Sequence, residues 1–136
     1  MNIAICIDKS GGTSFNGRRL SQDSVVREIL LKLAPGSNLF MNEYSAKQFK
    51  ADEKIKVAED FLLKAGERDI CFIENVAVPM DRVSEIYLFN WNRDYPADTY
   101  FNFNPDENNF KRIKKKDFIG SSHKKITLEV YKRGDL

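Results

Sequence analysis

The chain has 136 residues, of which 22 are Lys or Arg and 20 are Asp or Glu, so its net charge is +2. This length predicts one domain that buries its own core, and the balanced charge provides no global attraction to nucleic acid or to a membrane. No apolar run is long enough to cross a bilayer, and Asp8 and Lys9 follow the first apolar stretch too soon for a secretory signal. We therefore expect a single cytoplasmic domain over residues 1–136, with neither a membrane nor a nucleic-acid partner.

The first half of the chain alternates apolar strands with helices. Residues 3–7 form a short run rich in β-branched residues, which is typical of a strand at the centre of a sheet. Residues 8–19 hold three glycines without any periodicity and predict a long loop. A helix should begin at Ser21, where Ser21 and Asp23 suit the N-cap and first turn, and should end before Pro35. The next expected elements are a strand over 38–41, a short helix over 44–49, a small strand over 54–57 and a helix over 59–65.

The second half predicts more strands and a change of strand direction. Strands are expected over 69–74 and 85–91, joined by a turn that contains Pro79 and one helical turn. Because these strands are separated by helical segments, they predict a parallel sheet. Residues 109–113 and 126–132 alternate apolar and polar side chains, as half-exposed antiparallel strands do. The pattern therefore predicts an α/β fold whose mixed sheet is mainly parallel and has an antiparallel C-terminal strand.

The cysteines and the single histidine give little support for redox or metal chemistry. Cys6 and Cys71 lie inside apolar strands without a C-x-x-C spacing, so we interpret both as small core residues. His123 stands in the string G-S-S-H, and one imidazole without neighbouring Cys or carboxylate residues is no metal site. We interpret His123 as a loop histidine and expect no metal.

Three strings in the C-terminal part carry a family resemblance. They read E-I-Y-L-F-N-W-N-R-D-Y-P-A-D-T-Y-F-N-F at 85–103, F-K-R-I-K-K-K-D-F at 110–118 and I-T-L-E-V-Y-K-R at 126–133. Their order and spacing resemble the last third of dihydrofolate reductases, with Asp98, Thr99 and Phe101 in register with the D-T-x-F-P string and Asn102 in place of its proline. L-S-Q-D at 20–23 is similar to the family's L-P-x-D. The resemblance implies a three-layer dihydrofolate reductase-like domain over 1–136. Other strings, such as N-G-R-R and W-N-R, are also similar to those of short bacterial proteins.

The sequence departs from that family where the family binds NADPH and folate. Glu43 follows the strand LFM, where the family places a phosphate-binding arginine, and Glu74 and Asn75 replace a double glycine. The stretch between Phe49 and Glu59 is too short for the strands that hold the adenosine half of NADPH and the glutamate of folate. We therefore expect no cofactor, and NADPH only under the alternative that the chain is a reductase with a reduced cofactor site.

The resemblance places a ligand cleft between loop 8–19, the helix after Ser21 and the loop beyond Trp91. Asp23 is the one candidate catalytic residue, because it resembles the family's acid that hydrogen-bonds the pterin ring; the alternative is a helix N-terminal aspartate worth about 0.3 to 1 kcal/mol. Arg18 and Arg19 either meet a ligand anion or are solvated, and the aromatic residues either stack on a ring or pack in the core. The expected ligand-binding residues are Ile5, Arg18, Arg19, Asp23, Phe89, Trp91, Asn92, Arg93 and Tyr95.

Three functions follow from these patterns. We expect a small-ligand-binding protein on an altered dihydrofolate reductase-like fold, with a nucleotide or heteroaromatic ligand in the former substrate cleft and no dihydrofolate reductase activity. The alternatives are the NADPH-dependent reductase and a homo-oligomeric interaction module. The only dense basic run is interpreted as a lysine-decorated edge strand that resists aggregation. It consists of Lys111, Arg112, Lys114, Lys115 and Lys116.

Overall fold

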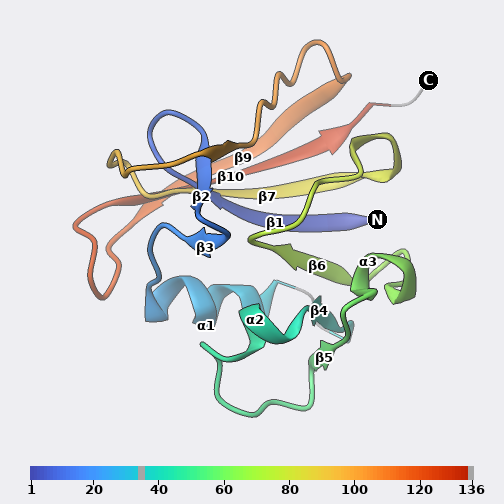
Figure 1. Ribbon diagram of the computed structural model, residues 1–136. Coiled ribbons are helices and arrows are strands. Elements are labelled where there is room, and N and C mark those ends of the chain that lie inside the picture. The colour runs from blue at the N-terminus through green and yellow to red at the C-terminus, as the bar shows by residue number, and fades with distance from the viewer. Residues whose placement is uncertain (34–35, 135–136) are drawn as a thin grey trace.

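The computed structural model describes residues 1–33 and 36–134, and in this part of the chain a seven-stranded sheet runs through the molecule (Figure 1). Its strands are β1 (Asn2–Ile7), β4 (Leu39–Met41), β5 (Ile55–Val57), β6 (Ile70–Ile73), β7 (Glu85–Asn90), β9 (Phe110–Phe118) and β10 (Ile126–Arg133). The strand order is β5-β4-β6-β1-β7-β10-β9. The first five strands pair in parallel, whereas β10 is antiparallel to both β7 and β9. The predicted mixed sheet is therefore confirmed.

The strand β1 occupies the centre of the sheet, as its apolar run predicts. In the register, Ile3 lies between Cys71 of β6 and Ile86 of β7. The C-terminal strand β10 lies one place from the edge, so its predicted antiparallel position near the edge is also confirmed.

Side chains that alternate along the strands form two cores, one on each face of the sheet. One face packs against α1 (Ser24–Lys32), whose Val26 and Leu30 are buried with Phe72 and Phe89. On the other face, Phe61 of α3 (Phe61–Lys64) is buried with Ile3, Ile5 and Ile86. The remaining helical segments among the described residues are α2 (Glu43–Ala46) and one 3-10 turn, η1 (Met80–Arg82).

The segment predicted as a long loop over 8–19 instead contains a hairpin. Its strands β2 (Gly12–Phe15) and β3 (Arg18–Arg19) join β8 (Thr99–Tyr100) in a small sheet of order β3-β2-β8. The two residues between β2 and β3 are Asn16 and Gly17, with φ of 51° and 72°. A two-residue hairpin turn with positive φ at both positions strongly prefers Asn-Gly, so this dipeptide is the signal that the loop prediction overlooked.

Several boundaries differ from the prediction. Helix α1 begins at Ser24, with Asp23 as N-cap, and ends at Lys32; Pro35, the predicted stop, lies outside the described residues. Helices α2 and α3 are shorter than predicted. Strand β9 extends to Phe118, well beyond the predicted end at Ile113, because an exposed edge strand needs no apolar alternation to be paired.

The two thiols are free. Cys71 is buried and Cys6 is half-buried. Burial raises the pKa of Cys71 to about 11, and burial followed by the charge of Glu74 raises the pKa of Cys6 well above its ordinary value. Both thiols are therefore poor nucleophiles, because the thiolate is the reactive form. Among the residues that the structure describes, no helix has the length and apolar character needed to cross a membrane.

Candidate functional site

The carboxylate of Asp23 is enclosed at the N-terminus of α1, and its side chain has 0% exposure. Its Oδ1 accepts hydrogen bonds from the backbone N–H groups of Val25 and Ser121, both at 2.9 Å. Its Oδ2 accepts from the backbone N–H of Ser122 at 2.9 Å, from the Ser122 hydroxyl at 3.2 Å and from His123 Nδ1 at 2.9 Å. All the acceptor capacity of this acid is thus taken up by donors of the chain itself.

These donors hold Asp23 in its ionised form. Burial alone would raise the pKa of Asp23, but the Ser122 backbone N–H, the His123 ring and the backbone N–H groups of Ser121 and Val25 together hold it well below its ordinary value. An ionised Asp23 can only accept, so His123 Nδ1 carries the hydrogen. A glycine is required nearby, because a Cβ on Gly120 would lie 2.4 Å from Asp23 Oδ2.

His123 lies in the loop 119–125 that joins β9 to β10, and its ring is buried. The imidazole stacks on Trp91, with ring centroids 4.6 Å apart and an interplanar angle of 23°. Its Nε2 lies 3.0 Å from Ser21 Oγ and 3.1 Å from Tyr95 Oη. When Nδ1 donates to Asp23, Nε2 of the neutral ring has one lone pair, which accepts a hydrogen from one of these hydroxyls. His123 is therefore a loop histidine as predicted, but it is buried and has a carboxylate neighbour, which the sequence did not predict.

Arg19, a candidate anion ligand, is paired within the protein. Its Nε lies 3.0 Å from Glu74 Oε2, its Nη2 lies 3.2 Å from Oε1, and its guanidinium lies over the Tyr44 ring at 4.3 Å. Glu74 also accepts from Ser45 Oγ at 2.7 Å and from Gln48 Nε2 at 2.9 Å. The charge of Glu74, expected to repel a phosphate, is thus neutralised by a fork of two hydrogen bonds.

Two predicted ligand-binding residues belong to the core. Phe89 is 0% exposed and packs edge-to-face with Phe118, at 6.4 Å between centroids. Ile5 is 2% exposed. The expected ligand contact of Phe89 is corrected, because the alternation of β7 turns its side chain into the sheet face that α1 covers. Arg18 is exposed in the β2–β3 hairpin.

The cleft expected beside Asp23 is closed. Its remaining cavity measures about 10 Å³ and is bordered by Cys6, Ser21, Glu74 and Trp91 among others. A space of this size holds about one water molecule, so a ring ligand does not fit in it.

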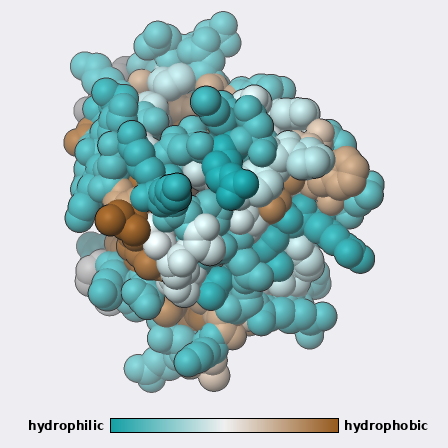
Figure 2. Space-filling view, turned by 90° about the vertical axis from the view of Figure 1, so that its left-hand side faces the viewer, coloured by the Kyte–Doolittle hydropathy of each residue, from teal (hydrophilic) through white to brown (hydrophobic). Residues whose placement is uncertain are grey.

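A larger hollow of about 570 Å³ lies next to the His123 and Trp91 stack, at the carboxyl ends of the parallel strands. Figure 2 looks onto this end of the molecule and shows a largely hydrophilic surface with scattered apolar spots. The hollow brings three predicted ligand residues together with the 119–125 loop. It is lined by Trp91, Asn92, Arg93, Ser122, His123, Lys124 and Lys125.

The two loops that form this hollow are tied together by Asn92. Its φ is 58°, in the left-handed region that Asn tolerates, and its Nδ2 donates to the Lys125 carbonyl at 3.2 Å and to Thr127 Oγ1 at 2.9 Å. Of the three cations in the wall, Arg93 lies 5.5 Å from the centre of the Tyr95 ring, and Lys125 Nζ lies 3.5 Å from Asp117. The residues that line the hollow thus include three cationic side chains and no carboxylate, although Asp117 outside the lining partly neutralises Lys125.

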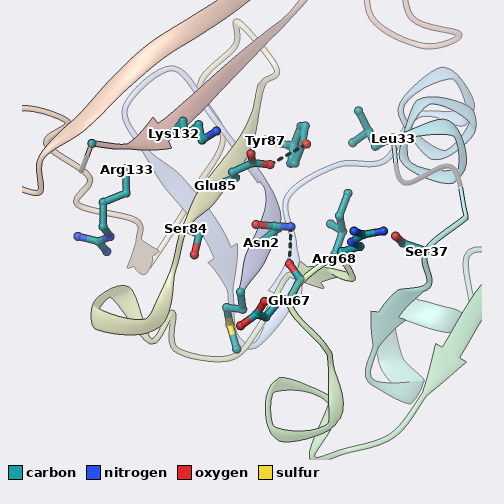
Figure 3. A pocket seen from close by; sticks show the side chains of 13 residues that line it. Asn2, Leu33, Ser37, Glu67, Arg68, Ser84, Glu85, Tyr87, Lys132 and Arg133 are labelled. Carbon is teal, nitrogen blue, oxygen red and sulfur yellow. Dashed lines mark hydrogen bonds between the residues drawn. The ribbon is translucent and has the colours of Figure 1, made fainter. Parts of the chain in front are cut away.

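A second hollow, of about 840 Å³, lies at the opposite end of the parallel strands and has walls of mixed charge (Figure 3). Asn2 Nδ2 donates to the Glu67 carbonyl at 3.0 Å, and the Tyr87 hydroxyl donates to Glu85 at 3.1 Å. Arg133 donates to the backbone carbonyls of three residues, so it fastens loops together rather than facing a ligand. These residues are Met80, Val83 and Asn108.

Comparisons with known proteins find a likeness in structure alone. No family model matches the sequence, and no curated protein matches it either. Dihydrofolate reductase from Enterococcus faecalis, complexed with NADP(H) and RAB-propyl, is similar with a TM-score of 0.66 over 99% of this chain and 97% of that one, at 13% identity. The chain has a dihydrofolate reductase-like fold. The resemblance stated from the sequence is thus confirmed for the fold.

Within this dihydrofolate reductase-like fold, the ring that hydrogen-bonds Asp23 is one of the protein's own. The sequence led us to expect that Asp23 hydrogen-bonds the ring of a ligand, and in the structure its Oδ2 accepts a hydrogen bond from the imidazole of His123. Among the described residues, no group of three or more His, Cys, Asp or Glu side chains is arranged to hold a metal ion.

Proposed function

We propose that this dihydrofolate reductase-like chain binds a small anionic ligand of the nucleotide class in the 570 Å³ hollow beside the His123 and Trp91 stack. The observation that carries the proposal is the convergence of Arg93, Lys124 and Lys125 on one concave surface whose lining residues include no carboxylate. The volume lies in the range of about 300 to 1,000 Å³ that small-molecule sites have.

The polar groups of the hollow suit a phosphate attached to a ring. A guanidinium such as that of Arg93 can hold two phosphate oxygens at once, and lysines add point charges. Ser122 and His123 belong to a loop that five hydrogen bonds to Asp23 and its neighbours hold in place, so the wall exists before a ligand arrives. A preformed wall lowers the entropic cost of binding.

The same contacts argue against dihydrofolate reductase activity. Asp23 has no free acceptor for a pterin, and Arg19 is engaged by Glu74. Glu43 is exposed at the start of α2, where an anionic cofactor would meet its charge. We therefore propose that the ligand binds in the neighbouring hollow and not in the expected substrate cleft, and that binding does not require NADPH.

A thermal-shift panel of ATP, GTP, AMP, NADPH and dihydrofolate, followed by calorimetry, tests this proposal. A ligand at about 100 times its dissociation constant adds about 2.7 kcal/mol to stability, which is readily seen as a shift in Tm. Arg93→Ala should weaken nucleotide binding by at least about tenfold, or 1.4 kcal/mol, whereas Lys56→Ala on the far edge strand β5 should leave it unchanged.

Other outcomes would support the alternatives. Stabilisation by NADPH and dihydrofolate alone would overturn the nucleotide site and favour a reductase. Stabilisation by no compound, together with self-association that grows with protein concentration, would favour the homo-oligomeric module.

A further inference from the structure

Three polar side chains, of which only His123 also lines the proposed ligand hollow, are connected in a particular order. Asp23 Oδ2 lies 2.9 Å from His123 Nδ1, and His123 Nε2 lies 3.0 Å from Ser21 Oγ. A carboxylate, an imidazole and a hydroxyl linked through these atoms form the chain by which serine hydrolases activate their nucleophile. Such a chain is recognised by geometry and roles rather than by position in the sequence.

We propose that Ser21, His123 and Asp23 form a nucleophilic triad that cleaves esters of short acyl groups. Ser21 is the nucleophile, His123 is the general base and Asp23 is a positioning residue. This activity is separate from the ligand binding proposed above, which depends on Arg93 and the lysines.

The surroundings of His123 fix it as a base. Asp23 is ionised and immobile, so it keeps the hydrogen on Nδ1 and leaves the lone pair on Nε2, where Ser21 needs it. Stacking on Trp91 prevents the ring from rotating away. An imidazolium that forms during the reaction would be stabilised by the adjacent carboxylate.

The position of Ser21 limits the substrate class. Ser21 is half-buried, and the 10 Å³ cavity that it borders has room for about one water molecule. An acyl group therefore has to approach Oγ from the solvent side, and this crowding favours a short group such as acetyl. Arg27 borders the same cavity and is held by a hydrogen bond of 3.1 Å to Gln22 Oε1. In this proposal its guanidinium supplies the positive charge that stabilises the negative carbonyl oxygen.

The reaction needs no cofactor. Ser21 Oγ bonds to the acyl carbon while its proton passes to His123 Nε2, and the tetrahedral intermediate then expels the alkoxide, which takes that proton and leaves as the alcohol. Water attacks the acyl-serine and gives a proton to Nε2; the C–O bond to Ser21 then breaks, Nε2 returns that proton to Ser21 Oγ, and the carboxylic acid is released.

Tyr95 restrains this chemistry. Its hydroxyl lies 3.1 Å from the same Nε2, and one lone pair cannot accept fully from two hydroxyls. Without the Tyr95 hydroxyl, Nε2 should accept its hydrogen bond from Ser21 alone.

The first experiment uses a fluorophosphonate probe, which reacts with activated serines, and peptide mapping by mass spectrometry. We expect an adduct on Ser21 that is lost in Ser21→Ala, retained in the neighbouring control Ser24→Ala and formed several times faster in Tyr95→Phe. Asp23→Asn should slow labelling and move the pH midpoint of the labelling rate, which a purely structural role would leave in place. Absence of an adduct on Ser21 in both the parent protein and Tyr95→Phe would overturn the proposal.

The second experiment tests whether His123 acts as a base. It needs no acyl substrate and avoids a substitution of the buried His123 itself. Ser21→Cys places a thiol beside Nε2, and we expect iodoacetamide to alkylate it at pH 7 faster than it alkylates a free cysteine, because the imidazole lowers the pKa of a paired thiol. Alkylation at or below the rate of free cysteine would show that His123 does not activate this position. Neither result depends on whether a nucleotide binds to Arg93.

Discussion

Asp23 and His123 act as one buried unit, and this changes what a substitution at Asp23 should do. If Asp23 is a ligand contact, as the sequence suggests, Asp23→Asn should remove a charge and leave the fold intact. In the structure, the carboxylate accepts from three backbone N–H groups, and an Asn would turn an NH2 group toward some of them. The structural role of Asp23 therefore comes before any role in binding.

We predict that Asp23→Asn lowers the free energy of unfolding by about 2 to 3 kcal/mol, because hydrogen bonds to a charged group are lost and buried donors are left unpaired. Denaturation in urea, followed by tryptophan fluorescence, measures the loss. Asp106→Asn, which changes an exposed carboxylate, is the matched control and should stay within about 0.5 kcal/mol of the parent. Equal stability of the two variants would contradict the structure around Asp23.

The contribution of Asp23 to the free energy of unfolding should depend on pH. The pKa of Asp23 is lower in the folded chain than its unfolded value of about 3.9, so its stabilisation is present above that value and is lost as the pH falls below it. The difference in unfolding free energy between the parent and Asp23→Asn should be largest above pH 4 and should shrink at lower pH. A difference that stays constant from pH 5 down to pH 2 would show that the pKa of Asp23 is not depressed.

The sequence predicted part of the site and could not predict its centre. Trp91, Asn92 and Arg93 were expected to follow the end of a strand, and they do border a hollow there. His123 meets Asp23 across 100 positions of sequence, and no local pattern reports such a contact. The available signal was the small and polar string before His123, since Gly120 and two serines let the backbone approach a carboxylate closely.

At the scale of elements, the apolar strands at the centre of the sheet were predicted correctly and the short polar strands of the hairpin were not. β1 and β7 each bury three of their six residues and leave none fully exposed, so their composition reflects their position in the sheet. Strands β2 and β3 are only four and two residues long, and their pairing depends on the turn between them. Asn16 and Gly17 are a clear sequence signal for that turn. The loop prediction for residues 8–19 overlooked it, because that prediction used only the number of glycines and the lack of periodicity in the segment.

The hairpin turn gives a prediction at this scale. Gly17→Ala should lower the free energy of unfolding by about 1 to 2 kcal/mol, because a side chain disfavours the left-handed backbone. Nothing lies within 4 Å of a Cβ at this position, so the effect comes from the backbone and not from a clash. Gly17→Asn is the control, since Asn tolerates this conformation, and it should cost less than Ala. If thermal unfolding ranks Asn below Ala, backbone strain is not the cause.

For the whole molecule, the two edges of the main sheet are protected in different ways. β5 is only three residues long, whereas β9 has nine residues and pairs on one side only, with β10. In the register, Lys114 lies opposite Val130 and Lys116 opposite Leu128, so both lysines project from the face that carries the α1 core. A long edge strand offers unpaired backbone groups to another chain, and lysines oppose that pairing by charge.

Replacing Lys114 and Lys116 together by Val should therefore make the protein self-associate. The substitutions remove two positive charges and raise β-propensity on an edge that already has Ile113 at 59% exposure, with Ile119 at 78% just beyond it. Antiparallel pairing of two β9 strands, which brings lysines against lysines in the parent, would lose much of its repulsion. Size-exclusion chromatography with light scattering should show larger species that increase with concentration, and thioflavin fluorescence should rise on incubation. Lys47→Val with Lys50→Val is matched in charge and composition but lies outside the strands, and it should elute as the parent does. If both double variants behave alike, the protection comes from net charge and not from the placement of lysines along β9.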